Sequence, residues 1–209
     1  MSDTIRTNAA TVAAVQVNDG SAQRSEVRLL RVTFSGPVTF AGGNVAAAFQ
    51  LLHVQTGKNV ALSATTATDS LGRTVVTLGF SGGETDPVSG LNGGIASLAD
   101  GRYQLTVLAA NVIGPYGIPL AGDGTDVGSN YVSPADTYQG NGLHLYRLFG
   151  DVNGDGVVDA TDVGQLKSTF NRNNTDPLYL WYLDADNSGA VDASDIGQFK
   201  SRFNVNVFG

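Results

Sequence analysis

The stretch DVNGDGVVDATD, residues 151–162, largely determines how the C-terminal part of this 209-residue chain folds. It places oxygen-bearing side chains at its positions 1, 3, 5, 9 and 12, and DADNSGAVDASD repeats the spacing at residues 184–195. The residues concerned are Asp151, Asn153, Asp155, Asp159 and Asp162 in the first stretch, and Asp184, Asp186, Ser188, Asp192 and Asp195 in the second. Two such strings in register indicate one physical cause.

The spacing is typical of a calcium loop. Ca²⁺ takes six to eight oxygen ligands in a flexible geometry, and a twelve-residue loop supplies them from these positions. Position 6 is glycine in both stretches, Gly156 and Gly189, which permits a sharp turn, and position 7 gives the backbone carbonyls of Val157 and Ala190. Position 12 is aspartate, where the usual helix–loop–helix sensor has glutamate. The sequence therefore predicts two Ca²⁺ ions, one in each loop.

A short helix is predicted after each loop. Asp159 and Asp192 are the expected N-caps, with the position 12 aspartates in the favoured first turn. Apolar residues spaced at i, i+3 and i+7 predict a buried stripe on each helix: Val163, Leu166 and Phe170 on the first, Ile196, Phe199 and Phe203 on the second. Between the repeats, Asp176 as an N-cap and Pro177 at the first helical position predict a short linker helix.

Apolar residues outside these helices are predicted to complete the core. Position 8 of each loop, Val158 and Val191, is apolar, as expected if the two loops pair back to back. Trp181, with Leu180 and Leu183, is interpreted as core, and a sugar-stacking role for its indole ring is the alternative.

The repeat extends beyond the loops. Residues 151–171 and 184–204 share 12 identities in 21 aligned positions. Chelation and core packing explain half of these. The others are Ala160/Ala193, Gly164/Gly197, Gln165/Gln198, Lys167/Lys200, Ser168/Ser201 and Asn171/Asn204. Glycine inside a helix costs about 1 kcal/mol relative to alanine, so its recurrence indicates close approach of a partner, with unselected duplication or helix-on-helix packing as alternatives.

Duplicated loop–helix units with aspartate at position 12 and a linker between them resemble a type I dockerin domain over about residues 148–209. The resemblance implies a calcium-folded module that attaches its parent protein to a cohesin domain on a scaffold. In that family, positions 10 and 11 of each loop and the lysine-bearing turn contact cohesin. Together with the recurring helix flank, the expected partner-binding residues are Ala160, Thr161, Gly164, Lys167, Ser168, Ala193, Ser194, Gly197, Lys200 and Ser201.

The region before residue 147 is predicted to be all-β. Residues 101–107 alternate strictly between apolar and polar side chains, and a phase change between Leu29 and Leu30 predicts a β-bulge. Further β-rich runs, separated by turn sequences, cover residues 11–17, 27–34, 49–54, 59–66 and 73–80. Such a series favours a sandwich. SLADGRY resembles the start of the penultimate strand of bacterial immunoglobulin-like domains, with Tyr103 placed like a tyrosine corner.

We therefore predict a mixed fold with two domains: an all-β immunoglobulin-like sandwich at residues 8–146, then a small all-α dockerin-like calcium-binding domain at 147–209. Residues 121–142 are polar and glycine-rich and are predicted to form a long loop, and 143–149 to return to strand. This pairing resembles the C-terminal tails of large secreted bacterial proteins, including those of planctomycete type. Residues 1–14 lack the apolar core of a signal peptide, so we expect a piece of a larger protein.

Composition excludes several classes of function. The net charge of −7 is local, because the two loops alone contribute −8, and no basic patch predicts nucleic-acid binding. No apolar run approaches the roughly 18 residues of a membrane span. The absence of cysteine excludes disulfides, thiolate metal sites and the cysteine-bearing calcium repeats of thrombospondin type.

Catalysis finds little support in the sequence. The chain has two glutamates, Glu26 and Glu84, and most aspartates before residue 147 lie in turn sequences. No acid in an apolar setting is evident, as paired carboxylates for glycoside hydrolysis require, and no nucleophile elbow or P-loop is present. His53 and His144 are interpreted as packed or surface residues.

The leading hypothesis is a non-catalytic, calcium-dependent attachment module of a secreted or cell-surface protein. Its partner would be a cohesin-like domain, with a link to polysaccharide degradation through the parent protein. Two alternatives stay open: a carbohydrate-binding β-sandwich, and a purely structural tail made rigid by calcium.

Overall fold

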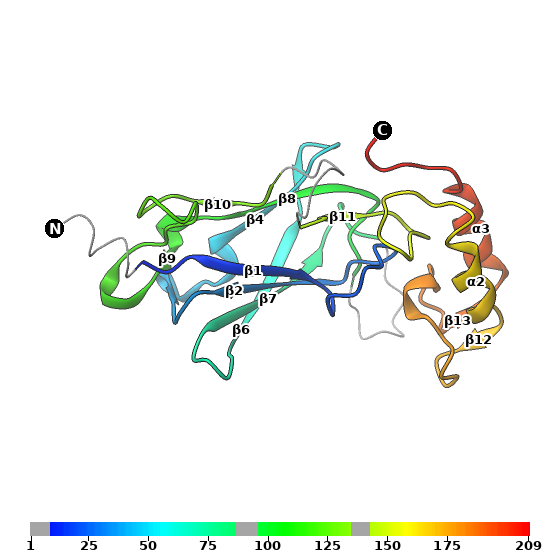
Figure 1. Ribbon diagram of the computed structural model, residues 1–209, viewed down its shortest axis with the longest axis horizontal. Helices are drawn as coiled ribbons and strands as arrows, with labels where there is room; N and C mark the ends of the chain where they lie inside the picture. Colours follow the sequence, from blue (N-terminus) through cyan, green and yellow to red (C-terminus); the bar gives the residue numbers. More distant parts are fainter. Residues whose placement is uncertain (1–8, 87–95, 135–142) are drawn as a thin grey trace.

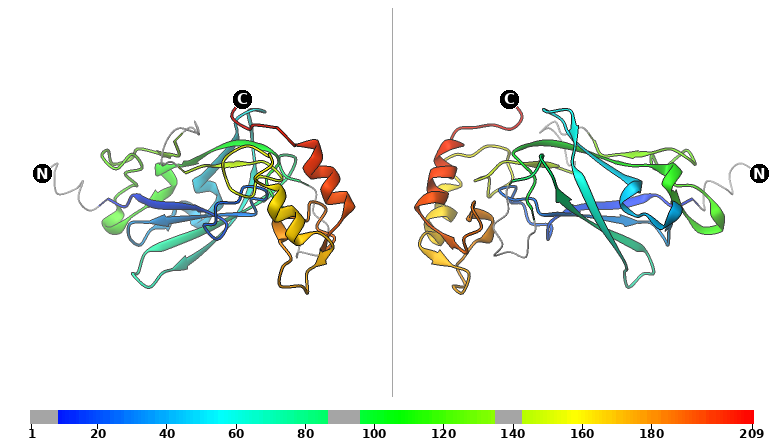
Figure 2. Two further views of the ribbon diagram at one scale, coloured as in Figure 1. Left: turned by 45° about the vertical axis from the view of Figure 1, so that its right-hand side comes forward. Right: turned by 180° about the vertical axis from the view of Figure 1, so that it is seen from behind.

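The computed structural model describes residues 9–86, 96–134 and 143–209. Strands extend along most of the molecule, while the helices α2 (Val163–Thr169) and α3 (Ala193–Ser201) lie together at the end opposite the N-terminus (Figure 1). The two views of Figure 2 show the same separation. An all-β part followed by a small helical part is the order that the sequence predicts. Among the described residues, no helix is both long and apolar enough to cross a membrane.

One antiparallel sheet has the strand order β1–β2–β7–β6. Its strands are β1 (Val12–Val17), β2 (Leu29–Phe34), β6 (Ala61–Thr68) and β7 (Thr74–Ser81). The central strands β2 and β7 bury alternate side chains, as expected where one face of a sheet covers a core. The edge strand β6 is mostly exposed.

A second antiparallel sheet has the order β10–β8–β4–β5, and β11 also pairs with β8. Its strands are β4 (Phe49–His53), β5 (Lys58–Asn59), β8 (Gly101–Val107), β10 (Tyr131–Val132) and β11 (Tyr146–Arg147). β8 alternates as the sequence predicts, because Tyr103, Leu105 and Val107 are buried while the residues between them are half-buried.

Short elements complete the two parts. β3 (Thr39–Phe40) pairs with β9 (Val112–Ile113), and β12 (Arg172–Asn173) pairs with β13 (Ala190–Val191). The 3₁₀ turns are η1 (Ala41–Gly43), η2 (Ala46–Ala48), η4 (Ala109–Asn111), η5 (Pro115–Gly117) and η6 (Trp181–Leu183).

The two sheets share one hydrophobic core. Leu30 and Leu78 from the first sheet and Leu51 and Leu105 from the second are fully buried in it, and burial of each leucine stabilises the fold by about 1.5–3 kcal/mol. A separate cluster, which begins at Tyr146, fills the C-terminal part. The predicted boundary near residue 147 falls inside β11, and the exact domain limits stay a prediction.

Two local predictions about individual strands of the β part were wrong. The pairing of β2 is regular at Leu29 and Leu30, and the irregularity lies between Val12 and Ala14 of β1. The apparent phase change arises because Val27 is buried but precedes the strand. Residues 59–66 are not one strand, because the chain crosses from β5 in one sheet to β6 in the other at buried Val60.

The predicted loop at 121–142 contains strand β10, which pairs with β8, and its residues 135–142 lie outside the described part. The strand predicted at 143–149 is shortened to β11, two residues long. Both differences arise from pairing with β8, a contact between distant segments that local composition does not encode.

The predicted N-cap was right for α3 and wrong for α2, and the predicted linker helix between the repeats was wrong. Asp192 caps α3, accepting from the Ser194 amide at 2.8 Å, and Asp195 completes the capping box. α2 starts only after Asp162, so Asp159 is not its N-cap, although the Asp159 carboxylate accepts from the Thr161 amide in the same way. The expected linker helix is replaced by a turn around Asp176 followed by η6, because the Asp176 side chain accepts the Leu178 amide and its carbonyl accepts the Tyr179 amide.

Tyr103 has the hydrogen bond expected of a tyrosine corner. Its side chain is 1% exposed, and its hydroxyl donates to the Ala99 carbonyl, four residues upstream, at 2.7 Å. Burial raises the pKa of this phenol above its usual value of 10, so it stays a neutral donor.

We expect Tyr103→Phe to lower the free energy of unfolding of the β part by about 1 kcal/mol, because the carbonyl of the half-buried Ala99 loses its donor. Urea denaturation followed by circular dichroism measures the change. Tyr116→Phe is the matched control, since Tyr116 is 89% exposed. Equal stability of both variants and the unaltered chain would contradict a stabilising role for the bond.

Candidate metal centre and docking surface

Position 1 of each loop is a buried aspartate held by backbone amides and a tyrosine. Asp151 accepts from the Gly154 and Gly156 amides at 2.7 and 2.9 Å and from the Tyr146 hydroxyl at 2.6 Å. In the second loop, Asp184 accepts from the Ser188 and Gly189 amides at 3.0 and 2.8 Å and from the Tyr179 hydroxyl at 2.5 Å. Both loops therefore hold their position 1 aspartate through a tyrosine hydroxyl and two backbone amides, one of which belongs to the position 6 glycine.

Position 12 ties each loop to the start of its helix. Asp162 accepts from the Val152 and Asp159 amides, both at 2.9 Å. Asp195 accepts from the Ala185 and Asp192 amides, both at 2.7 Å. Each position 12 carboxylate thus joins position 2 of its loop to position 9, so loss of this side chain would open the loop at both ends.

The electrostatics of these four carboxylates favour a bound cation. Asp151, Asp162, Asp184 and Asp195 are fully buried. Burial raises the pKa of each carboxyl, and that of Asp195 reaches about 6. The ion pairs among the described residues provide none of the four with a lysine or arginine partner. A buried anion is costly unless a positive charge is close, and a divalent cation would meet that need.

The loops differ in how closely their acids converge. In the second loop, oxygens of Asp184, Asp186 and Asp195 all lie within 4.8 Å of one another, and this is the one such group among the described residues. The acids of the first loop do not meet that spacing. An all-oxygen donor set of this kind suits a hard cation such as Ca²⁺.

The other predicted ligands line the loops but interact mainly with their neighbours. Asn153 and Asp155 form hydrogen bonds with each other. Asp159 accepts a hydrogen bond from the Thr161 hydroxyl, and Asp192 accepts one from the Ser194 hydroxyl. Ser188 donates to the position 7 carbonyl of Ala190 at 3.1 Å, and Val157 holds the corresponding position in the first loop. Calcium ligation by these predicted residues stays a prediction.

Tyr146 and Tyr179 are site residues that our sequence reasoning missed. Each precedes position 1 of its loop by five residues, and each donates its hydroxyl to that aspartate. A signal was present, because the two tyrosines are separated by the same 33 residues as the loops.

The two loops do not pair back to back as predicted. Instead, each loop pairs with the segment that follows the other repeat's helix. The Asn171 amide donates to the Val191 carbonyl at 2.8 Å, and the Asn204 amide donates to the Val158 carbonyl at 2.7 Å. Val158 and Val191 are fully buried, as expected for core residues.

The pairing of each loop with the segment after the other repeat's helix also explains why asparagine recurs after both helices. Asn171 and Asn204 have φ values of +59° and +65°, a left-handed conformation that asparagine tolerates at a helix C-terminus. The asparagines are therefore required by the fold and are removed from the candidate partner surface.

The C-terminal segment closes over the first loop. The Val207 amide donates to the Gly156 carbonyl at 2.9 Å, and the Phe208 ring packs edge-on against Tyr146 at 5.1 Å. A side chain at Gly156 would lie 2.3 Å from the Phe208 ring, so this close approach, as well as the φ of +84°, requires glycine there.

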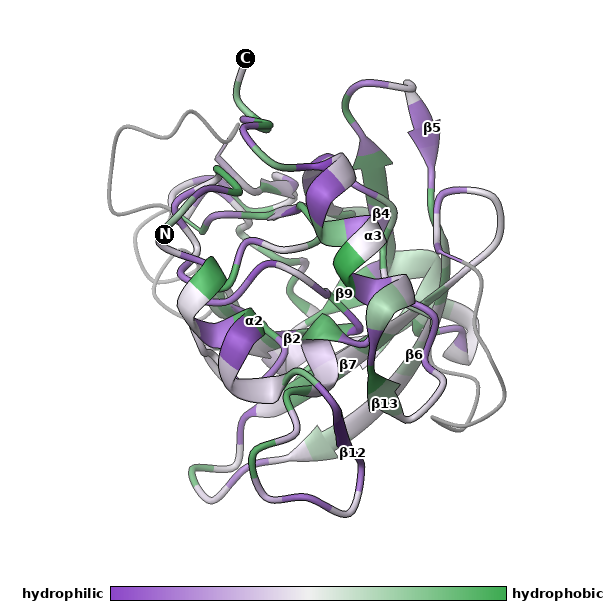
Figure 3. Ribbon diagram, turned by 90° about the vertical axis from the view of Figure 1, so that its right-hand side faces the viewer, coloured by the Kyte–Doolittle hydropathy of each residue, from purple (hydrophilic) through white to green (hydrophobic). Residues whose placement is uncertain are grey.

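All ten predicted partner-binding residues are exposed. Figure 3 faces the end of the molecule that carries both helices. A side chain at Gly164 or Gly197 would meet no atom within 4 Å, so helix-on-helix packing does not explain the two glycines. Ser168 and Ser201 donate back to the helix carbonyls of Gln165 and Gln198.

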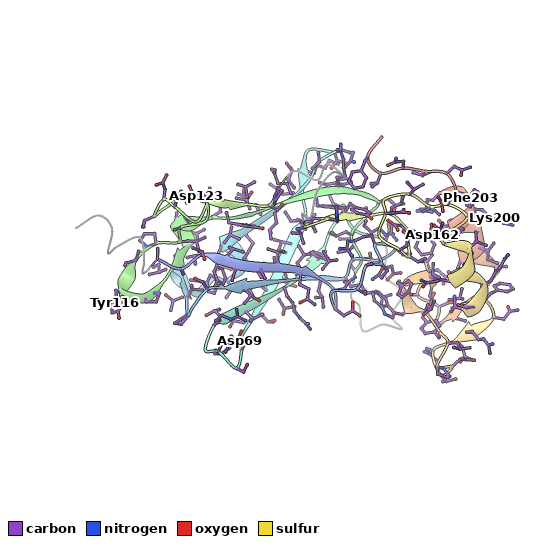
Figure 4. All side chains as sticks on the ribbon, in the orientation of Figure 1. Asp69, Tyr116, Asp123, Asp162, Lys200 and Phe203 are labelled. Atoms are coloured by element: carbon purple, nitrogen blue, oxygen red, sulfur yellow. The ribbon has the colours of Figure 1, made fainter. Side chains whose placement is uncertain are left out.

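Phe170 and Phe203 were wrongly assigned to the core. They are 37% and 41% exposed, because each lies beyond the end of its helix, where the buried stripe no longer faces the domain interior. Figure 4 shows Phe203 beside Lys200 at the end of the molecule away from Tyr116. Each repeat therefore presents an exposed phenylalanine near its lysine.

Two residues outside the loops also differ from expectation. Glu26 is an acid in a buried setting, 1% exposed, and burial raises its pKa to about 7. It pairs with Arg28 at 2.6 Å between their side-chain atoms, so it is part of a structural ion pair. Trp181 is half-buried beneath Arg28, whose guanidinium carbon lies 4.3 Å from the ring centre.

Comparison with known protein families finds a match, and it covers the two loops and the helices that follow them. Residues 149–204, which hold both loops and both helices, match the family model described as dockerin type I domain. The C-terminal part of the chain is therefore similar to a dockerin type I domain. The match covers 56 of 209 residues, so it leaves the nature of the β part open. No curated protein matches the chain significantly.

Solved structures resemble the chain weakly. The N-terminal part of the bacterial S-layer protein SbsC has 16% identity and a TM-score of 0.35, over 58% of this chain and 23% of that one. An N-terminal interface mutant of a type II cohesin–X–dockerin complex from Acetivibrio cellulolyticus has 14% identity and a TM-score of 0.27, over 81% of this chain and 96% of that one. This chain thus spans less than a quarter of the S-layer structure, and neither likeness establishes a fold or a function for it.

Proposed function

We propose that this chain is a non-catalytic, calcium-dependent attachment module of a secreted or cell-surface protein. The observation that carries the proposal is the pair of loops with buried position 1 and position 12 aspartates, each loop followed by an exposed helix flank. Within the part of the chain that the structure describes, these aspartates form no ion pair with lysine or arginine. The dockerin match over residues 149–204 supports it. Ca²⁺ supplies the positive charge that lets the loops close, and each of the two loops takes one ion.

The partner is a cohesin-like domain that docks on the helix flanks. Ala160, Gly164 and Lys167, and their counterparts in the second repeat, are exposed and have no fold role that explains their recurrence. Exposed aromatic side chains are common anchors of protein interfaces, and Phe170 and Phe203 extend the same surface. Because the two flanks are alike, the partner can bind in two orientations related by pseudo-twofold symmetry.

The test measures binding of a recombinant type I cohesin domain to the full chain in calcium. We expect Gly164→Gln with Lys167→Glu to weaken binding only about twofold, because one of two equivalent faces is lost. Adding Gly197→Gln and Lys200→Glu should abolish binding while both calcium ions stay bound. Arg73→Glu, in a β turn distant from the helices, is the control. Complete loss of binding in the single-flank variant would exclude two orientations, and full binding by the double-flank variant would exclude this surface.

The β part is proposed to be an immunoglobulin-like sandwich that carries the dockerin domain. The tyrosine corner at Tyr103 and the two sheets around one core support this. Tyr116 is the one strongly exposed aromatic residue among its described residues, and a single ring offers no row of sugar-stacking platforms. A carbohydrate-binding role therefore gains no support, and the link to polysaccharide degradation depends on the parent protein.

A further inference from the structure

The connection between β1 and β2 packs against the dockerin domain. Its residues 22–28, which we call the junction segment, form no regular secondary structure. Ser25, Glu26 and Val27 are nevertheless at most 1% exposed. A segment of the β-domain buried in this way must find its hydrogen-bond partners elsewhere, and many of them lie in the calcium loops and the residues around them.

The junction segment holds the first loop and the residues just before it through two backbone hydrogen bonds and one serine side chain. The Arg24 amide donates to the Asp151 carbonyl at 2.9 Å, and the Leu148 amide donates to the Arg24 carbonyl at 3.0 Å. The Gly150 amide donates to the Ser25 hydroxyl at 2.8 Å. At Gly154, a side-chain carbon would lie 2.1 Å from the Ala22 carbonyl oxygen, so the loop and the β-domain are in direct contact there.

The same segment holds the second loop through side chains. The Arg28 guanidinium donates to the Asn187 side-chain oxygen at 2.5 Å and covers the Trp181 ring. Its other contact, with Glu26, fixes the guanidinium in place. The Ser25 hydroxyl donates to the Tyr182 carbonyl at 2.5 Å, just before the second loop begins.

Both contacts fall at the same position of the repeat. Gly154 and Asn187 are each position 4 of their loops, and both have positive φ, at +78° and +53°. Position 4 lies between two ligand positions, 3 and 5, so its placement sets the direction of both neighbouring side chains. One short segment of the β-domain thus touches the equivalent point of two loops.

A second set of contacts fixes the end of α3 to the same domain. Asp100, before β8, accepts from Arg202 at 2.6 Å and from Arg147 and the Phe149 amide at 2.8 Å each. Arg147 is 2% exposed and also donates to the Ser25 carbonyl. The two domains are therefore joined by partly buried charge pairs as well as by the junction segment.

We infer that the junction segment positions the two calcium loops by holding position 4 of each, so that the β-domain acts in cis to raise their calcium affinity. The inference rests on the proposed calcium binding by the loops. Groups that orient metal ligands without touching the metal typically contribute 10- to 100-fold in affinity. Since coupling is reciprocal, calcium should in turn raise the melting temperature of the β-domain.

The first test compares two arginine variants of the full chain by calorimetric titration with calcium alone. Arg28→Ala removes the Asn187 contact, and we expect one of the two sites to bind about tenfold more weakly. Arg73→Ala is the matched control, because the ion pair that Arg73 forms among the described residues is with Asp69, four residues before it in the β6–β7 turn. Both sites should keep their affinity in this variant. Trp181 is the one tryptophan of the chain, so its fluorescence reports the junction during the same titration.

The second test exchanges position 4. Gly154→Asn gives the first loop the residue that the second loop already accommodates at positive φ, so the backbone of the loop tolerates it. The asparagine side chain must nevertheless displace Ala22, and we expect the first site to weaken about tenfold. Gly124→Asn is the control, because Gly124 has φ of +82° and open space around it.

The outcomes separate this inference from the proposed function. If the unaltered chain takes up no calcium, the proposed function fails and the inference fails with it. If it binds two ions, and Arg28→Ala and Gly154→Asn bind them as tightly as their controls, the inference alone is overturned. If Arg28→Ala does not fold, Arg28→Lys replaces it, because lysine keeps the charge but cannot contact Glu26 and Asn187 at the same time. Calcium binding by Arg28→Lys as tight as that of the control would then overturn the inference.

Discussion

Removal of calcium should unfold residues 148–209 and leave the β-domain folded. The position 1 and position 12 carboxylates of each loop are buried beside further aspartates, and without a cation these charges repel one another in a poorly solvated site. A metal that binds only the folded state stabilises it by about 2.7 kcal/mol at 100 times its dissociation constant. Two loops together would then supply about 5 kcal/mol, which is comparable to the whole stability of a small domain.

The β-domain should survive because it has its own core, formed by both sheets. Circular dichroism in chelator should therefore show loss of the helical signal with retention of the β signal, and added calcium should restore the helices. Calorimetry should count two ions per chain. Dissociation constants near 10⁻⁴ to 10⁻³ M are typical of extracellular modules. An unchanged spectrum in chelator, or no heat of calcium binding, would contradict the prediction.

The second large effect is expected from position 12. Asp162→Ala and Asp195→Ala each remove a fully buried carboxylate that joins two backbone amides of its loop. We expect calcium affinity at the altered loop to fall at least 100-fold, beyond the usual effect of losing a supporting residue. Asn153→Ala should be much milder, because Asn153 is exposed and uncharged.

Asp195→Ala should be the more damaging of the two. Asp195 also forms the capping box of α3, and loss of a cap costs about 1 kcal/mol. Disorder of α3 would release the Asn204–Val158 bond, which braces the first loop. Titration of each variant, with helicity measured at saturating calcium, tests the ranking. If Asn153→Ala proved as harmful as Asp195→Ala, the special role of position 12 would be wrong.

Only the structure distinguishes the repeated residues that the fold requires from those that are left as evidence for a partner. In the sequence, chelation and core packing explain half of the twelve identities between the repeats and leave the other six alike. The structure separates these six: Asn171 and Asn204 adopt a left-handed conformation, whereas Gly164 and Gly197 face open space. Only residues without a fold role are left as evidence for a partner.

The sequence alone was sufficient to predict two loops that are each followed by a helix, because the pattern of a calcium loop is local. Its ligand types, its glycine at position 6 and the helix that follows all lie within about twenty residues, and each has a physical requirement that spacing reveals. The alternating strand β8 was predictable for the same reason, since alternation directly reflects burial of one face.

Tertiary structure decided everything that depends on distant pairs. Arg28 and Asn187 are 159 residues apart, and Arg202 and Asp100 are 102 apart. No periodicity links such residues, and the sequence predicted only a boundary between two domains near residue 147. The exposure of Phe170 and Phe203 is likewise set by where each helix ends relative to the packed core. The chemistry of the two loops is thus local and encoded by spacing, whereas their attachment to the β-domain arises from long-range packing, which a single sequence does not reveal.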